Sequence, residues 1–126
     1  MAATALLGGA CSASNDDRKR AVKDVVAESV GHQAAMLGIL EAHKDDRAQA
    51  LALLDAYLQA NGPSLDRIAH QRALLESDMA AMADAMKTYG AALGQNLERR
   101  QRLETDRPEL MADPQVRAAL ARLDAL

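Results

Sequence analysis

Residues 65–103 read LDRIAHQRALLESDMAAMADAMKTYGAALGQNLERRQRL, and this stretch decides the fold class. It contains no proline, and its two glycines lie near its end. Two rows of residues recur every seven positions and are offset by four: Ile68, Leu75, Met82 and Tyr89, and Arg72, Met79, Met86 and Leu93. Alternating steps of three and four place both rows on one side of an α-helix, as in helices packed lengthwise. The stretch therefore predicts one long, continuous helix.

The composition of the 126-residue chain also favours an all-α fold. Phe and Trp are absent and Tyr occurs twice, whereas Ala and Leu are abundant. Good helix formers dominate, and the β-branched and aromatic residues that favour strands are sparse. A core without large aromatic side chains suits thin contacts between helices. The length is enough for one small domain.

The distribution of charge argues against nucleic-acid binding. The chain has 15 basic and 18 acidic residues, which are intermixed, and a net charge of −3. Nucleic acid requires a concentrated basic face. The one basic cluster, at Arg99, Arg100 and Arg102, is flanked by Glu98 and Glu104. This pattern is typical of a solvated helix face.

A short apolar run, AATALLGGA at residues 2–10, precedes the single cysteine, Cys11. Nine residues are too few to cross a bilayer as a helix, and the run is similar to the end of a secretory leader. Together with the cysteine, LLGGAC at residues 6–11 resembles the lipobox of bacterial lipoproteins. The resemblance implies cleavage before Cys11, a diacylglyceryl group on its sulfur, and a position on the periplasm-facing side of the bacterial cell envelope.

The residues after the cysteine, up to Asp17, are small and polar, as a tether from a lipid anchor should be. We therefore expect residues 1–17 to form a leader and disordered tether, and residues 18–126 to form a single helical domain. A single cysteine cannot form an internal disulfide. The alternative is a cytosolic N-terminus with an incidental thiol, which would make the protein a cytosolic coiled-coil adaptor.

Two helices of matching length are expected in the body of the chain, over residues 17–60 and 64–105. The aspartates of Lys44-Asp45-Asp46 could cap a separate helix over residues 47–60. Because no glycine or proline falls between Ile39 and Asn61, and the helical spacing continues, the sequence favours one long helix. That helix should end at Asn61-Gly62-Pro63-Ser64, where Asn61 or Gly62 can take the left-handed backbone conformation and Pro63 cannot continue the helix. Ser64 can then cap the next helix.

Equal helices joined by a tight turn form an antiparallel αα-hairpin. This register places Met36 near Tyr89, and Glu28 near Arg99. The pair Asp113-Pro114 predicts a short last helix that ends near Asp124 and docks on the hairpin. Its expected apolar face consists of Val116, Ala119, Leu120 and Leu123.

Some apolar residues lie outside the predicted seam: Leu37, Leu53, Leu74, Ala83 and Leu97. A second copy of the chain would cover them and complete a four-helix bundle. We therefore expect self-association, or association with another envelope protein.

Four residues form a candidate metal site: His43, Met79, Met82 and Met86. The hairpin register places His43 opposite Met82, and thioether and imidazole ligands together suit copper, Cu(I) in particular. The competing interpretation is that methionines at this spacing fill a helical core.

No catalytic grouping is recognisable in the sequence. It contains no Ser/His/Asp pattern, Gly-rich phosphate loop or haem attachment motif. We therefore expect no catalytic residue and no cofactor. The favoured function is a small, non-enzymatic helical lipoprotein that serves as a scaffold or protein-interaction module. The alternatives are a copper-binding or small-ligand-binding helical protein and the cytosolic adaptor.

Overall fold

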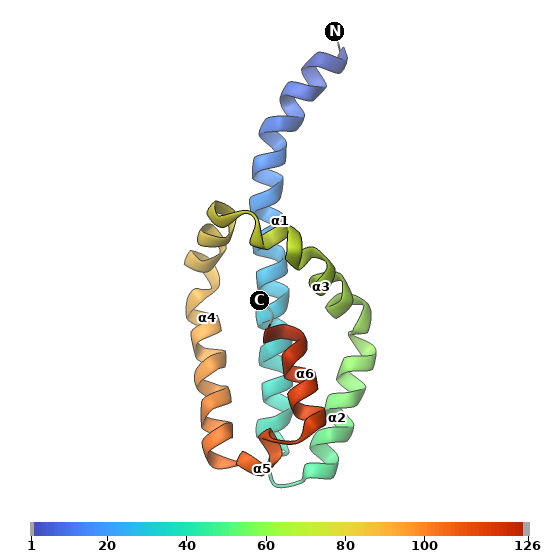
Figure 1. Cartoon of the computed structure of the whole chain (residues 1–126), viewed down its shortest axis with the longest axis vertical. Coiled ribbons are helices and arrows are strands. Elements are labelled where there is room, and N and C mark those ends of the chain that lie inside the picture. Colours follow the sequence, from blue (N-terminus) through green and yellow to red (C-terminus); the bar gives the residue numbers. More distant parts are fainter. Residues whose placement is uncertain (1, 125–126) are drawn as a thin grey trace.

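The computed structural model describes the backbone of residues 2–124 and the side chains of residues 15–72 and 77–123 (Figure 1). Within these residues the chain forms six helices and no strand, so the predicted all-α class is confirmed. The helices are α1 (Ala2–Ala42), α2 (Arg47–Ala60), α3 (Gly62–Glu76), α4 (Met79–Asp106), α5 (Pro108–Met111) and α6 (Pro114–Asp124). Most of the predicted leader and tether, including Cys11, lies outside the described side chains.

The long helix α1 is the axis on which the other helices pack (Figure 1). α2 and α3 return along it in the opposite direction, and His32 on α1 contacts both Tyr57 on α2 and Ser64 on α3. α4 then runs parallel to α1. Lys23 lies 3.1 Å from Asp84 near the start of α4, and further ion pairs join the later ends of the two helices. The bundle therefore runs down, up, down, and finally up again through α6.

An antiparallel helical hairpin is thus present, but it is formed by α1 with α2–α3, and its turn lies at residues 43–46. The predicted turn at residues 61–64 and the pairings derived from it are wrong. Glu28, for example, pairs with Arg67 on α3 and not with Arg99. Residues 15 and 16 already belong to α1, so this helix begins before residue 17, where the sequence placed its start.

The favoured single helix over residues 17–60 is interrupted because the turn after α1 has partners that are distant in the sequence. Asp46 caps α2, since its Oδ1 accepts a hydrogen bond from the backbone N–H of Gln49 at 3.1 Å. Three charged residues at or beside the turn each form an ion pair with a residue between positions 106 and 113: Lys44 with Asp106, Asp45 with Arg107, and Arg47 with Asp113. The separate helix at residues 47–60, the alternative interpretation, is the correct one.

The predicted continuous helix over residues 65–103 is also interrupted, at residues 77–78. Asp78 caps α4, because its Oδ1 accepts a hydrogen bond from the backbone N–H of Ala81 at 3.0 Å. The chain reverses here and places the start of α4 beside α1. An aspartate cap without glycine or proline is a weak stop signal inside an unbroken heptad pattern.

Asn61 bends the chain without reversing it, and α2 and α3 follow one another along α1 (Figure 1). The backbone N–H and the side-chain amide of Asn61 both donate to the carbonyl oxygen of Tyr57, each at 2.9 Å. Its φ is −107°, and no described residue has a positive φ. The left-handed residue expected at this position does not occur.

The buried apolar side chains form two clusters along α1. The first lies where α1, α2 and α4 meet α5 and α6, and the second lies where α1 meets α3 and the start of α4. The second contains Val22, Val25, Val26, Ile68, Ala81 and Ala85. The first includes Met36, Leu40, Leu54, Leu103, Val116, Leu120 and Leu123.

Helix α6 begins and packs as predicted. The carboxylate of Asp113 accepts a hydrogen bond from the backbone N–H of Gln115 at 2.8 Å, and the expected apolar face of α6 is fully buried. A helix of 11 residues is marginal in isolation, so burial of this face is what stabilises it. Each leucine that it buries contributes about 1.5–3 kcal/mol.

Candidate functional site

A polar network joins α1 to the bend between α2 and α3. The Nδ1 atom of His32 lies 2.5 Å from the hydroxyl oxygen of Tyr57, and its Nε2 atom lies 3.0 Å from Oγ of Ser64. The Ser64 hydroxyl donates to Glu28 at 3.4 Å, and Glu28 also pairs with Arg67. The sequence does not reveal this grouping, because the residues that contact one another across helices are 25 to 39 positions apart.

These hydrogen bonds link three helices. The Ser64 hydroxyl lies within hydrogen-bond distance of both His32 and Glu28, so α3 is joined to α1 at two side chains. Burial lowers the pKa of His32, opposed by the Glu28 carboxylate and reinforced by the Arg67 guanidinium. The network therefore fixes the bend at Asn61 against α1.

Polar side chains also set the contact between α1 and α4. Asn96 is buried and donates to the carbonyl oxygen of Val30 and to Oε1 of Gln33, each at 3.2 Å. Further along, Nε of Arg99 donates to both carboxylate oxygens of Glu41 at 3.1 and 3.2 Å. This hydrogen bond is the main reason that the pKa of Glu41 is lowered. These contacts hold the two helices in a parallel register.

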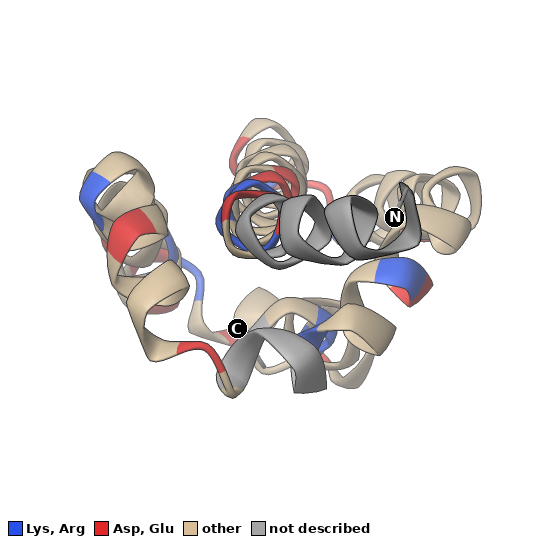
Figure 2. Ribbon diagram, turned by 90° about the horizontal axis from the view of Figure 1, so that it is seen from above, with Lys and Arg blue, Asp and Glu red and all other residues tan. Residues whose placement is uncertain are grey.

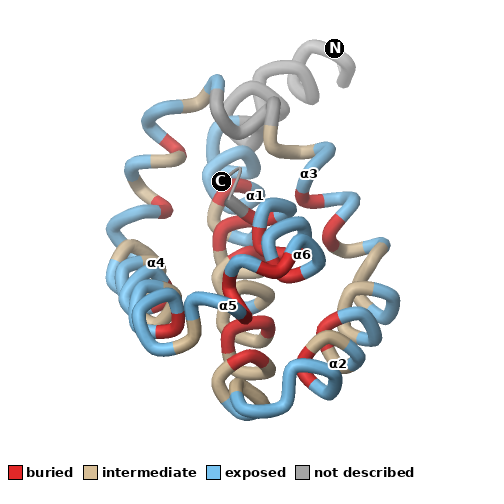
Figure 3. Tube along the Cα trace, turned by 60° about the horizontal axis from the view of Figure 1, so that its bottom comes forward, coloured by how far each residue is buried: buried red, intermediate tan, exposed pale blue. Residues whose placement is uncertain are grey.

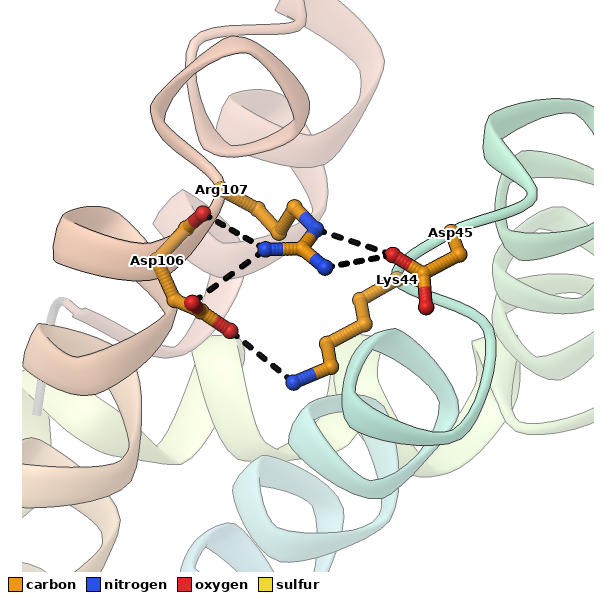
Figure 4. A network of polar contacts seen from close by, with 4 residues as sticks. All are labelled: Lys44, Asp45, Asp106 and Arg107. Atoms are coloured by element: carbon orange, nitrogen blue, oxygen red, sulfur yellow. Dashed lines mark hydrogen bonds and ion pairs between the residues drawn. The ribbon is translucent and has the colours of Figure 1, made fainter.

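Where the contact between α1 and α4 ends, four side chains form a charged network: Lys44, Asp45, Asp106 and Arg107 (Figure 4). Nζ of Lys44 lies 2.9 Å from Oδ2 of Asp106, and Nε of Arg107 lies 3.1 Å from Oδ1 of Asp45. The hydrogen bond from Lys44, with the charge of Arg107, lowers the pKa of Asp106.

The charged network borders an open cleft of about 880 Å³ between α1 and α4. The charged residues that line it are Glu41, Lys44, Glu98, Arg99, Arg102 and Asp106. Three are cationic and three anionic, and two of the three possible pairs are already formed within the chain. The cleft therefore offers no net charge to a ligand.

The predicted metal site is not assembled. His43 lies in the turn after α1, beside the end of α4, whereas Met79, Met82 and Met86 lie in the first turns of α4 at the other end of the bundle (Figure 1). The pairing of His43 with Met82 assumed an antiparallel register, but α1 and α4 are parallel. Met82 packs against the second apolar cluster, as the competing interpretation expected.

The other two methionines belong to an exposed apolar surface, which we call the outer face of α4. It consists of Met79, Ala83, Met86, Gly90, Gly94 and Leu97. Steps of three and four residues place all six on one side of the helix. Met79 is 82% exposed, Met86 43% and Leu97 56%, and these are the exposed large hydrophobic residues of the described part of the chain.

The outer face of α4 is directed away from the rest of the molecule. Viewed from above, α4 stands at one edge of the bundle (Figure 2). Most of its residues are exposed or half-buried, and its buried positions are few (Figure 3). A Cβ added at Gly94 would meet no atom within 4 Å. Two charged residues border the face, Lys87 and Glu98, and neither has an ion-pair partner among the described residues.

A small apolar pocket of about 110 Å³ adjoins the same face. Its apolar lining consists of Leu37, Leu93, Leu97 and Leu120, and Gln33, Asn96 and Arg100 complete it. Of the residues that the sequence analysis assigned to a second copy, Leu37 is buried within the chain, whereas Ala83 and Leu97 are exposed. Leu74 lies outside the described side chains.

Within the described residues, no helix is long and apolar enough to cross a bilayer. The same part of the chain contains no cluster of three or more His, Cys, Asp or Glu side chains that could hold a metal ion. Comparison of the chain with protein families, with curated proteins and with solved structures finds no match.

Proposed function

We propose that this chain is a non-enzymatic protein-interaction module and that the outer face of α4 is its docking surface. The observation that carries the proposal is that Met79, Met86 and Leu97, on one side of one helix, are all exposed. Isolated exposed apolar residues are common on protein surfaces, but a contiguous apolar patch marks an interaction site. Apolar anchors at steps of three and four are the pattern by which one helix recognises another.

The distribution of polar networks supports the same conclusion. The His32 network and the charged network at Lys44 and Asp106 satisfy their own hydrogen bonds within the chain. They hold α1 in contact with α2, α3 and α4. Contacts of Asn96, Arg99 and Asp106 with α1 and the turn after it hold one side of α4 in place, and such pre-organisation lowers the entropy cost of binding on its other side.

We further propose that the module is anchored to the bacterial cell envelope through a lipid on Cys11. The support for the anchor is the stretch LLGGAC at residues 6–11. The intact mass of the chain purified from the membrane fraction of its native host tests this part. A lipid-modified chain that begins at Cys11 is the expected result. An unmodified, soluble chain with an intact N-terminus would instead favour the cytosolic adaptor.

The docking surface is tested by photo-crosslinking in the native host. A photoreactive residue replaces Ala83 on the outer face of α4 or, as a matched control, Ala52, which is exposed on α2. We expect an adduct of defined mass from position 83 only, and loss of this adduct when Met86→Glu is added. No adduct from position 83, or the same adducts from both positions, would contradict the proposal.

A further inference from the structure

We propose that the partner of the outer face of α4 is a second copy of this chain, bound antiparallel across a two-fold axis at the level of residues 92 and 93. The inference rests on the proposed function, because it uses the same surface. It specifies the occupant and the orientation, which the exposed methionines alone do not determine.

The charges that border the face indicate this arrangement. Lys87 and Glu98 are 11 positions apart, which is close to three helical turns, so they lie on the same flank of α4. Both are unpaired among the described residues, whereas Asp84, Arg99 and Arg100 on the same helix have partners within the chain. The two unpaired charges of α4 that border the face are therefore of opposite sign and on one side.

An antiparallel two-fold axis midway between these residues uses both charges. It brings Lys87 of each copy level with Glu98 of the other, and so forms two symmetric ion pairs. Residues on one flank of a helix meet the same flank of an antiparallel partner, as this pairing requires. In a parallel pair, Lys87 would come level with Lys87 and Glu98 with Glu98.

The apolar residues fit the same axis. Ala91 and Gly94 of one copy come level with Gly94 and Ala91 of the other, so small residues meet at the crossing and the helices can approach closely. Met86 comes within a turn of Leu97 on the second copy and fills the space beside the crossing. Within one copy, a Cβ added at Gly94 would meet no atom within 4 Å, so packing inside the chain does not require glycine at this position.

Sedimentation velocity of the full-length chain at low salt tests the proposal by charge reversal. We expect a concentration-dependent dimer. Lys87→Glu should raise the dimer dissociation constant by roughly fivefold or more, because each reversal replaces two attractive pairs with two repulsive ones. The double variant Lys87→Glu with Glu98→Lys should restore the dissociation constant to within about twofold of the original chain.

The matched control is Arg117→Glu, an exposed charge on α6 that is not part of the outer face of α4. It should leave the dissociation constant unchanged. A chain that stays monomeric at several hundred micromolar, a single reversal without effect, or a double variant that does not recover would each overturn the proposal. If the chain is monomeric and position 83 crosslinks to a different protein, the proposal that the partner is a second copy is overturned, and the proposed docking function remains intact.

Discussion

The Nε2 atom of His32 on α1 lies 3.0 Å from Oγ of Ser64 on α3, while Nδ1 of the same ring lies 2.5 Å from the hydroxyl of Tyr57 on α2. One imidazole thus spans the bend at Asn61. A neutral ring protonated on Nε2 satisfies the whole chain of donors: Tyr57 donates to Nδ1, Nε2–H donates to Ser64, and Ser64 donates to Glu28. Protonation of Nδ1 would remove the acceptor that Tyr57 uses.

This geometry makes the stability of the fold dependent on pH. The pKa of His32 is lowered in the folded state, chiefly by burial, so the unfolded chain takes up a proton first as the pH falls through about 6.5. The contribution of His32 to stability is complete above that value and is lost as the pH falls towards the folded pKa. We expect the urea midpoint to be lower at pH 5.5 than at pH 8.

The variant His32→Gln should show a smaller fall of the urea midpoint between pH 8 and 5.5. His70, which is exposed on α3, supplies the control, and His70→Gln should keep the original pH dependence. Equal pH dependence in the original chain and in His32→Gln would show that the ring does not couple proton uptake to unfolding.

Local signals in the sequence predicted the helical class, the end of the second long helix near residue 105, and the start of α6 at Asp113-Pro114. The order of the helices in space could not be predicted in this way. The turns at residues 43–46 and 77–78 contain neither glycine nor proline, and the first depends on partners about 60 residues away. The strongest local turn signal, Asn61-Gly62-Pro63, produces only a bend.

The heptad pattern of α4 identified a helix but did not determine which side is buried. The buried positions of α4 are Ala81, Ala85, Asn96 and Leu103. Met79 and Met86, which the pattern assigned to the seam, are exposed instead. The burial of small and polar residues in place of methionines follows from the close packing of α4 on α1, which sequence periodicity does not encode. The sequence therefore indicated Ala83 and Leu97 of the candidate docking face, whereas the exposure of Met79 and Met86 is seen only in the structure.

The aspartate cap of α4 distinguishes the observed break from a continuous helix. Asp78→Ala removes the acceptor for the N–H of Ala81 and should lower the free energy of unfolding by about 1 kcal/mol. If residues 65–103 formed one helix, the same change would place alanine in a helix interior and would stabilise the fold. Urea denaturation, monitored by circular dichroism, gives the sign of the change in the free energy of unfolding. Asp55→Ala, at an exposed position on α2, is the control, with an expected change within about 0.5 kcal/mol.

The parallel packing of α1 and α4 depends on Asn96, the one buried amide of α4. Asn96→Ala removes the donor to Val30 and Gln33 and should lower the free energy of unfolding by about 1–2 kcal/mol. The adjacent Gln95 is exposed, and Gln95→Ala should change the same quantity by less than about 0.5 kcal/mol. Similar effects of the two substitutions would argue that the Asn96 side chain does not set the helix contact.

Substitutions at two glycines allow the stability of one copy to be measured separately from the association of two copies. Gly31 on α1 and Gly94 on α4 both lie in helix interiors, and an added Cβ would meet nothing within 4 Å at either position. Alanine at each should therefore raise the free energy of unfolding of the monomer by about 0.5–1 kcal/mol, because glycine costs more backbone entropy on folding.

The same two substitutions should differ in their effect on the dimer. Gly94 lies at the proposed crossing, so Gly94→Ala should push the two copies of α4 apart and weaken association several-fold in sedimentation velocity. Gly31 lies on α1, away from the outer face of α4, and Gly31→Ala should leave association unchanged. An equal dissociation constant for both variants would show that the two helices do not approach closely at Gly94. Because Gly94→Ala is expected to make the monomer more stable, weaker association could not be attributed to unfolding.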